Sequence, residues 1–151
     1  MFDCLYALDE KTLRPKPHLA LSHKRIDDTT WEFTLRQGVT FHNGEPFNAA
    51  AVKYSFDRVL DAKRKLYDKP KWDKIIDSVE VLDDYTVRIK TQKPFPIMLE
   101  NLSYDAAMVP PGYIEEKGDA EFGERAVGTG PYKLVSWKRA EEIVFVRNDD
   151  Y

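Results

Sequence analysis

The strongest secondary-structure signal in the chain is TWEFTLR, from Thr30 to Arg36. Its apolar side chains, Trp31, Phe33 and Leu35, alternate with polar ones. Alternation with a period of two residues is typical of a β-strand that buries one face. We therefore predict a strand here, with these three side chains in the core.

A tight turn and a helix are predicted directly after this strand. Gly44 in the pair Asn43-Gly44 adopts positive φ at little cost, which favours a turn. Asn48 is a good N-cap residue for a helix over Ala49 to Leu60. The apolar residues of that segment fall on one helical stripe, which should lie on the sheet: Val52, Phe56, Val59 and Leu60.

The remaining sequence predicts shorter elements separated by polar and proline-containing connections. These elements are a hairpin of 75–82 and 86–91, a short helix after Pro94 and Pro96, a short strand over 106–109, a short helix over 110–117 and a hairpin of 132–137 and 143–146. Because hairpins prevail over βαβ units, we expect an α+β fold, with a largely antiparallel sheet and helices packed on one face. The length of 151 residues suits a single domain.

Composition and charge exclude several classes of partner. The chain is 42% apolar and 32% charged, as expected of a globular protein, and its formal net charge is −3. A slightly acidic chain is a poor ligand for nucleic acid or an anionic membrane surface. No apolar run approaches the roughly 20 residues that cross a bilayer, so we expect no membrane insertion by this segment.

The residue types of catalysis and metal binding do not occur in a working pattern. Cys4 is the sole cysteine, so neither an internal disulfide nor a cysteine zinc site can form. The histidines lack metal-ligand spacing, the Ser22-His23 pair lacks an orienting acid, and the Gly128-Thr129-Gly130 turn lacks the lysine of a phosphate-binding loop. Acidic pairs at 83–84 and 149–150 are typical of turns. We therefore predict no enzyme, no metal site and no cofactor.

Four residues on irregular segments are our candidates for ligand contacts: Tyr67, Trp72, Tyr104 and Asp105. Aromatic side chains on loops can cover a solute with large, stiff, amphipathic surfaces. The alternative is that Trp72 packs against Ile75 and Ile76 in the core and that Asp105 is a solvated loop acid.

A long motif gives the chain a resemblance to a known family. The motif is DDTTWEFTLRQGVTFHNGEPF at 27–47, preceded by HLALS at 18–22 and followed by DRVL at 57–60, DDYTVRI at 83–89, VGTGPYK at 127–133 and RNDDY at 147–151. In order and spacing this resembles the bacterial extracellular solute-binding proteins of family 5, the peptide and nickel receptors of ABC importers. The resemblance extends over nearly the whole chain.

The resemblance implies a segment of a larger two-lobed fold of the type II periplasmic-binding-protein kind. Residues 1–151 would be the small subdomain of the first lobe with short flanking pieces of the large lobe, and both termini are expected to be cut. The whole protein would be periplasmic or anchored at the cell surface, and would deliver peptides or other small polar solutes to ABC transporter permease subunits.

Two alternatives to a peptide receptor remain open at this point. One is a stand-alone structural or interaction domain; the other is a receptor for nickel or another non-peptide solute. Some nickel-type members carry an arginine on the loop that corresponds to 103–107, whereas this chain has no basic residue between Leu102 and Val109. That difference argues against an anionic chelate bound there.

Overall fold

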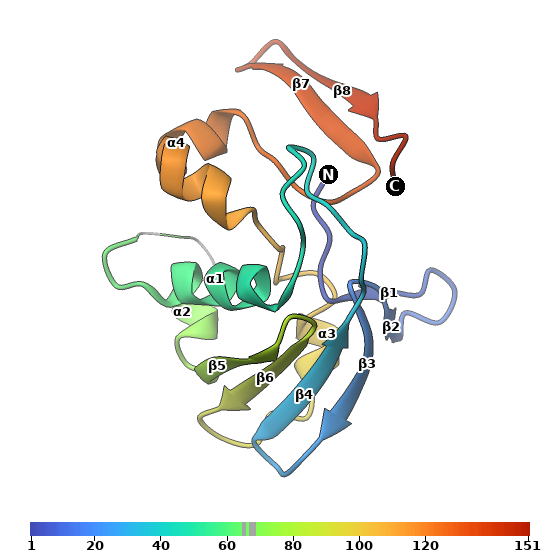
Figure 1. Cartoon of the computed structure of the whole chain (residues 1–151), viewed down its shortest axis with the longest axis vertical. Coiled ribbons are helices and arrows are strands. Elements are labelled where there is room, and N and C mark those ends of the chain that lie inside the picture. Colours follow the sequence, from blue (N-terminus) through green and yellow to red (C-terminus); the bar gives the residue numbers. More distant parts are fainter. Residues whose placement is uncertain (65, 67–68) are drawn as a thin grey trace.

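The computed structural model describes residues 1–64, 66 and 69–151 and contains both helices and antiparallel strands (Figure 1). In chain order the elements are β1 (Tyr6–Leu8), β2 (Pro15–Pro17), β3 (Ala20–Arg25), β4 (Thr30–Leu35), α1 (Ala49–Leu60), α2 (Lys69–Trp72), β5 (Ile76–Asp83), β6 (Thr86–Thr91), α3 (Met98–Asn101), α4 (Pro111–Glu124), β7 (Tyr132–Lys138) and β8 (Glu142–Arg147). The predicted α+β class is confirmed.

The central element is a four-stranded antiparallel sheet in the order β3-β4-β6-β5. The strand predicted from TWEFTLR is β4, and Phe33 lies opposite Val87 of β6. Trp31, Phe33 and Leu35 are 6%, 0% and 1% exposed, so the predicted burial is confirmed. The hairpin predicted over 75–91 is also confirmed, as β5 and β6.

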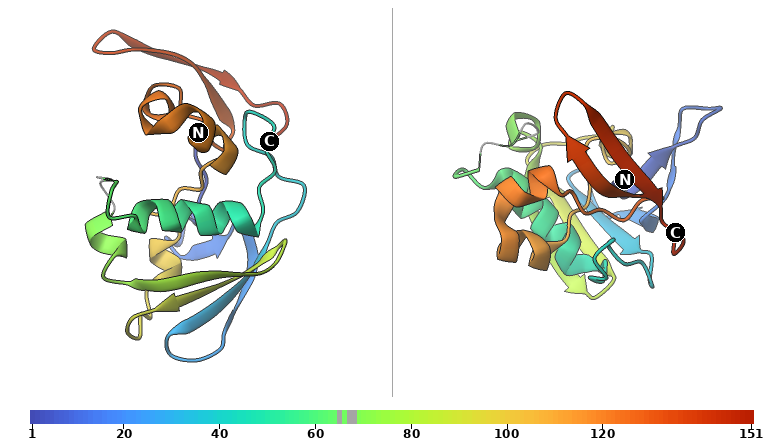
Figure 2. Two further views of the ribbon diagram at one scale, coloured as in Figure 1. Left: turned by 60° about the vertical axis from the view of Figure 1, so that its left-hand side comes forward. Right: turned by 90° about the horizontal axis from the view of Figure 1, so that it is seen from above.

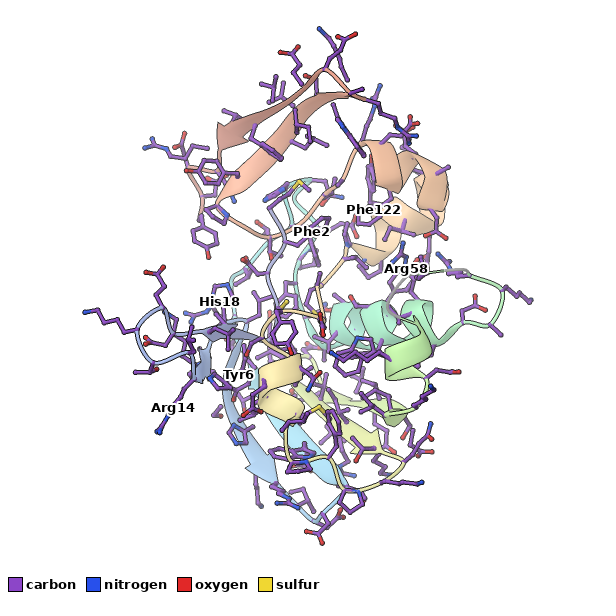
Figure 3. The ribbon with its side chains drawn as sticks, turned by 180° about the vertical axis from the view of Figure 1, so that it is seen from behind. Phe2, Tyr6, Arg14, His18, Arg58 and Phe122 are labelled. Atoms are coloured by element: carbon purple, nitrogen blue, oxygen red, sulfur yellow. The ribbon has the colours of Figure 1, made fainter. Side chains whose placement is uncertain are left out.

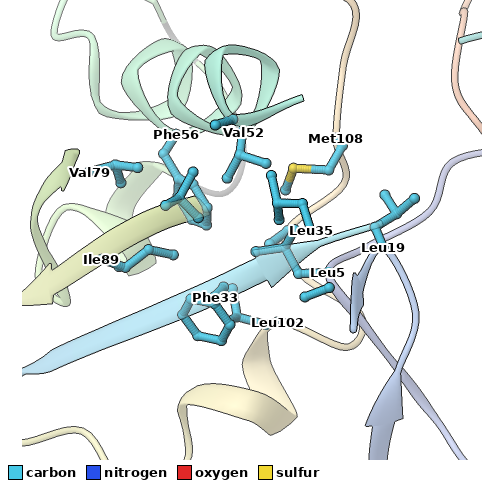
Figure 4. Close-up of a cluster of buried hydrophobic side chains, with 14 of the residues drawn as sticks. Leu5, Leu19, Phe33, Leu35, Val52, Phe56, Val79, Ile89, Leu102 and Met108 are labelled. Carbon is cyan, nitrogen blue, oxygen red and sulfur yellow. The ribbon is translucent and has the colours of Figure 1, made fainter. Parts of the chain in front are cut away.

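One face of this sheet carries the hydrophobic core and the other is polar. Val52 and Phe56 of α1 reach the core above β5 and β6, and Leu102 after α3 joins the same core (Figure 4). On the opposite face Arg88 bonds Glu32 at 2.6 Å and contacts Glu80 at 3.5 Å. Helices therefore pack on one face, as predicted.

The start of α1 agrees with the capping prediction. The Asn48 side chain accepts a hydrogen bond from the Ala51 amide at 3.1 Å, which satisfies one of the free N–H groups at the helix start. Before it, Gly44 has φ of 88° in the predicted turn. Because the cap fixes where the helix begins, Val52 and Phe56 point into the core.

Two side chains of the same turn form hydrogen bonds with segments that are distant in sequence. His42 donates from Nε2 to the Gly130 carbonyl at 2.8 Å, because its Nδ1 accepts from the Gly128 amide at 3.3 Å. The Glu45 carboxylate accepts from the amides of Gly112 and Tyr113, both at 2.8 Å. A carboxylate there stabilises the N-terminus of α4. The motif at 27–47 thus specifies folding.

Two predictions of secondary structure were incomplete or wrong, and three strands were not predicted. The strand predicted over 106–109 is a single bridge between Cys4 and Ala107, because the N-terminal segment runs beside it over too short a length. The helix predicted over 110–117 continues to Glu124 across a kink at Gly118, whose φ is 83°. Strands β1, β2 and β3 were not predicted. Of these, β3 is exposed along nearly its whole length and shows no alternation, and β1 and β2 have three residues each.

The predicted final hairpin is confirmed, but it forms a separate two-stranded sheet away from the central one (Figure 2). Its apolar side chains are unusually exposed; those above a third exposed are Tyr132, Val135, Trp137, Ile143, Val144, Phe145 and Val146. The hairpin therefore contributes little to the main core.

Candidate functional site

Three of the four predicted contact residues come together beside α2 and the loop after α3. Trp72 ends α2, while Tyr104 and Asp105 follow α3. The fourth, Tyr67, lies outside the described residues. We call Lys71, Trp72, Tyr104 and Asp105 the rim cluster, since Lys71 connects the other three.

Trp72 supports the cluster from the core. Its side chain is 1% exposed, and its ring meets Phe56 of α1 edge to face at 5.4 Å. Its indole N–H donates to the Asp105 carbonyl at 3.0 Å. This burial agrees with the alternative interpretation of the sequence, in which Trp72 packs in the core. The ring that it contacts is that of Phe56. Trp72 therefore holds the loop in place and presents almost no surface to solvent.

Lys71 supplies a positive charge that the sequence analysis missed. Its ammonium group pairs with the Asp105 carboxylate. It also lies 5.4 Å from the ring centroids of both Trp72 and Tyr104. Because Lys71 and Asp105 are 34 positions apart in the sequence, no local sequence pattern could predict that they form an ion pair. The absence of a basic residue in 102–109 thus does not leave this loop without a cation.

The loop that carries Tyr104 and Asp105 is held by hydrogen bonds to α3. The Ser103 hydroxyl donates to the Leu99 carbonyl at 2.7 Å, and the Asp105 amide donates to the Asn101 carbonyl at 3.1 Å. Asn101 is itself buried and donates to the Ile97 carbonyl at 2.7 Å. Tyr104 is 59% exposed on this fixed backbone, so its ring is free to contact a solute.

A cavity of about 200 Å³ adjoins the cluster between α1, α4 and the segment 105–109. Its lining includes Trp72 and Asp105 together with Phe2, Arg58 and Phe122, and the last three are labelled in Figure 3. The Arg58 guanidinium lies 5.3 Å from the Phe122 ring centroid and 2.9 Å from Asp119. The cavity is therefore mostly apolar, and the arginine that faces it is already paired.

A second cavity, of about 330 Å³, lies near the N-terminal segment. Its most buried charged side chain is Asp3, whose carboxylate contacts His18 Nε2 at 3.1 Å and accepts from the Thr129 hydroxyl at 2.9 Å. Both carboxylate oxygens therefore have partners. Asp3 joins the start of the chain to the Gly128-Thr129-Gly130 turn, which makes its role structural.

Cys4, the sole cysteine, follows Asp3 on the N-terminal segment. Burial raises the pKa of the Cys4 thiol to about 11, so the thiol is protonated and a weak nucleophile at neutral pH. Among the described residues no group of three histidine, cysteine or acidic side chains could hold a metal ion. Within that same part of the chain, every helix is too short or too polar to cross a lipid bilayer.

The chain is similar in sequence to a known protein family and to several characterised proteins. Residues 14–151 match the family described as bacterial extracellular solute-binding proteins, family 5 Middle. The glutathione-binding protein GsiB of Pectobacterium atrosepticum is 40% identical over 118 residues, which is 78% of this chain and 23% of that protein. GsiB of Salmonella typhi is 39% identical over 141 residues, 92% of this chain and 27% of the relative. The chain thus spans about a quarter of the length of these relatives.

Solved structures agree with the sequence relatives. NikZ from Campylobacter jejuni, in complex with Ni(L-His), superposes with a TM-score of 0.89 at 33% identity, over 99% of this chain and 30% of NikZ. The periplasmic binding protein DppA from Helicobacter pylori, in complex with the peptide STSA, gives 0.89 at 29% identity, over 100% of this chain and 34% of DppA. The family match covers most of the chain and the fold agrees with that of its members, and so the chain belongs to the bacterial extracellular solute-binding proteins of family 5.

Proposed function

We propose that this chain is part of an extracytoplasmic receptor that captures peptide-like solutes and delivers them to the permease of an ABC importer. The observation that carries the proposal is the family match over residues 14–151, together with relatives named for binding glutathione and peptides. In this proposal the protein is not an enzyme. Its place is the periplasm or the outer side of the cell membrane.

Residues 1–151 would form the small subdomain of the first of two lobes, with short pieces of the large lobe at each end. A solute bound between two lobes buries most of its surface, and each lobe then satisfies part of its polar groups. The rim cluster suits such a place. It offers an exposed aromatic ring, a cation and an anion on a hydrogen-bonded backbone.

A non-peptide solute is the second candidate, because NikZ, at 33% identity, is described in complex with Ni(L-His). The described residues supply no group of three side chains that could hold a metal ion, so in this case the metal ligands would come from a chelator or from other parts of the receptor. Lys71 places a cation beside the segment 102–109, where it pairs with the Asp105 carboxylate.

The test is titration calorimetry on the intact receptor that contains this chain, with reduced glutathione, the dipeptide Met-Leu and Ni(L-His) as separate probes. Binding of either peptide with micromolar or tighter affinity supports the proposal. Saturable binding of Ni(L-His) alone would replace it by the second candidate, and absence of binding to all three would overturn the assignment to peptide-like solutes.

The contribution of this subdomain is tested by replacing Tyr67, Tyr104 and Asp105 together with Ala in the intact receptor. We expect the affinity for the peptide probe to fall by more than about threefold, which is roughly 0.7 kcal/mol. A triple Ala variant that binds as tightly as the unaltered receptor would show that the subdomain is only a scaffold. Circular dichroism on the same samples checks that the variant is folded.

A further inference from the structure

The turn at 128–130 is anchored by His42, and this contact requires a neutral imidazole ring. The His42 Nδ1 atom accepts from the Gly128 amide at 3.3 Å, while Nε2 donates to the Gly130 carbonyl at 2.8 Å. An amide only donates and a carbonyl only accepts, so the ring carries its proton on Nε2 and its lone pair on Nδ1. A protonated ring has N–H groups at both positions. Protonation of His42 therefore places donors opposite each other and removes the acceptor of the Gly128 amide.

The same turn has a second anchor, which a positive charge strengthens. The Thr129 hydroxyl donates to the Asp3 carboxylate at 2.9 Å, and both side chains are buried. The other carboxylate oxygen of Asp3 lies 3.1 Å from Nε2 of the partly exposed His18. Arg36 and Tyr151 also face His18, through its carbonyl at 3.0 Å and its Nε2 at 3.5 Å. Protonation of His18 turns its contact with Asp3 into an ion pair, which is stronger than a neutral hydrogen bond. The two histidines therefore respond to acid in opposite ways.

The groups around His42 determine in which pH range its anchor is lost. The pKa of His42 lies below its usual value of about 6.5, and burial of the ring is the largest cause. Lys133 of β7 and the amino group of Met1 also disfavour the charged ring, whereas the Gly130 carbonyl and the Asp3 carboxylate favour it. The anchor is therefore complete above about pH 6.5 and is lost as the pH falls below that value.

The turn at 128–130 also forms the base of the β7–β8 hairpin. Strand β7 begins just after it, at Tyr132, and Asn148 follows the end of β8. The Asn148 amide donates to the Pro131 carbonyl at 2.8 Å, and the Asn148 side chain donates to the Gly130 carbonyl at 3.2 Å. Beyond this base the apolar side chains of the hairpin are largely exposed. How the turn is anchored therefore determines how firmly the hairpin is joined to the rest of the chain.

We propose that the turn at 128–130 is a pH-sensitive latch, which holds the β7–β8 hairpin on the turn at 41–47 while His42 is neutral and releases it when His42 takes up a proton. In the released form the latch stays on the N-terminal segment, through Asp3 and through the Gly130 amide, which donates to the Met1 carbonyl at 2.8 Å. The central sheet keeps its structure, because its ladder of hydrogen bonds does not include the latch. This inference goes beyond the proposed function, since it holds whatever solute the receptor binds.

Hydrogen exchange at the Gly128 amide, measured by NMR in the intact receptor that contains this chain, reports the latch directly, because the acceptor of that amide is the His42 ring. Exchange itself depends on pH, so each rate is divided by that of an unstructured peptide with the sequence 126–132 at the same pH. Protection of Gly128 should fall by about fivefold or more below about pH 6.5, the equivalent of one hydrogen bond. Protection of Ile89, on β6 of the central sheet, should stay constant, which separates local opening from global unfolding.

Four variants identify the groups that control the latch. His42→Gln keeps an uncharged side chain at every pH, so the protection of Gly128 should no longer change with pH. His18→Gln is the matched control and should keep the change. Lys133→Gln removes a cation that disfavours the charged His42 ring, so the midpoint should move to higher pH. Lys138→Gln, farther along the same strand, should leave the midpoint where it is. A thermal melt of each variant confirms that it is folded.

The outcomes decide for or against the latch independently of the solute titrations. Loss of the change in His42→Gln, with a higher midpoint in Lys133→Gln, supports it. Constant protection of Gly128 in the unaltered receptor would refute it, as would a change that persists in His42→Gln or disappears only in His18→Gln. If Ile89 loses protection together with Gly128, the whole domain opens and the latch is refuted as well.

Discussion

Replacement of Phe33 by Ala tests the central feature of the fold, the burial of one face of β4. Phe33 is 0% exposed and has three ring neighbours, Tyr6 at 6.2 Å, His23 at 6.2 Å and Trp31 at 6.5 Å. Truncation of a buried phenylalanine loses its transfer free energy and leaves a cavity, which together cost about 3–5 kcal/mol. For a chain of this length that is a fall in melting temperature of roughly 6–20 °C.

Urea unfolding followed by circular dichroism measures this loss of stability. Thr34→Ala is the matched control, because Thr34 is the next residue on β4 and is exposed on the opposite face. Its effect should stay within about 0.5 kcal/mol. A Phe33→Ala variant that unfolds at the same urea concentration as the control would refute the assigned strand register and the argument built on it.

Three further predictions concern the turn at 41–48 and the isolated chain. The pKa of His42 is lowered, and burial is the largest cause. The contribution of His42 to stability is therefore present above about pH 6.5 and declines as the pH falls through that value. His42→Gln should remove this part of the decline, as measured by urea unfolding at several pH values. Glu45→Ala should cost about 1 kcal/mol and speed amide exchange at Gly112 and Tyr113, whereas unchanged exchange would contradict the cap. The isolated 151-residue chain should fold but bind the solute of the receptor weakly, since one lobe satisfies only part of its polar groups; a submicromolar dissociation constant by calorimetry would contradict this.

Local sequence patterns predicted the elements in which buried residues recur at a regular spacing. Trp31, Phe33 and Leu35 alternate with polar residues, and Asn48 caps the helix that follows, so both elements were found with their bounds nearly right. Strand β3 was missed because it lies at a sheet edge, where exposure removes the alternation. The extension of α4 beyond 117 was missed because Gly118 at positive φ interrupts the helical pattern.

The rim cluster could be predicted only in part, because its contacts join residues that are distant in sequence. Tyr104 and Asp105 were chosen for their place on an irregular segment. Lys71 was not, since only the folded chain brings it to Asp105. For Trp72 the sequence left two interpretations open. Its ring contact with Phe56 depends on how α1 packs against α2, which no local pattern encodes.

The exposed apolar surface of β7 and β8 affects how the 151-residue chain behaves when it is concentrated. A two-stranded ribbon with open edges and side chains such as Val135 and Ile143 in solvent is a template for edge-to-edge aggregation. The outer face of the central sheet is protected by contrast, because Glu32, Arg88 and Glu80 cover it with alternating charges. Self-association of this chain should therefore begin at the hairpin, and charged substitutions on β7 or β8 are the changes that would keep it monodisperse.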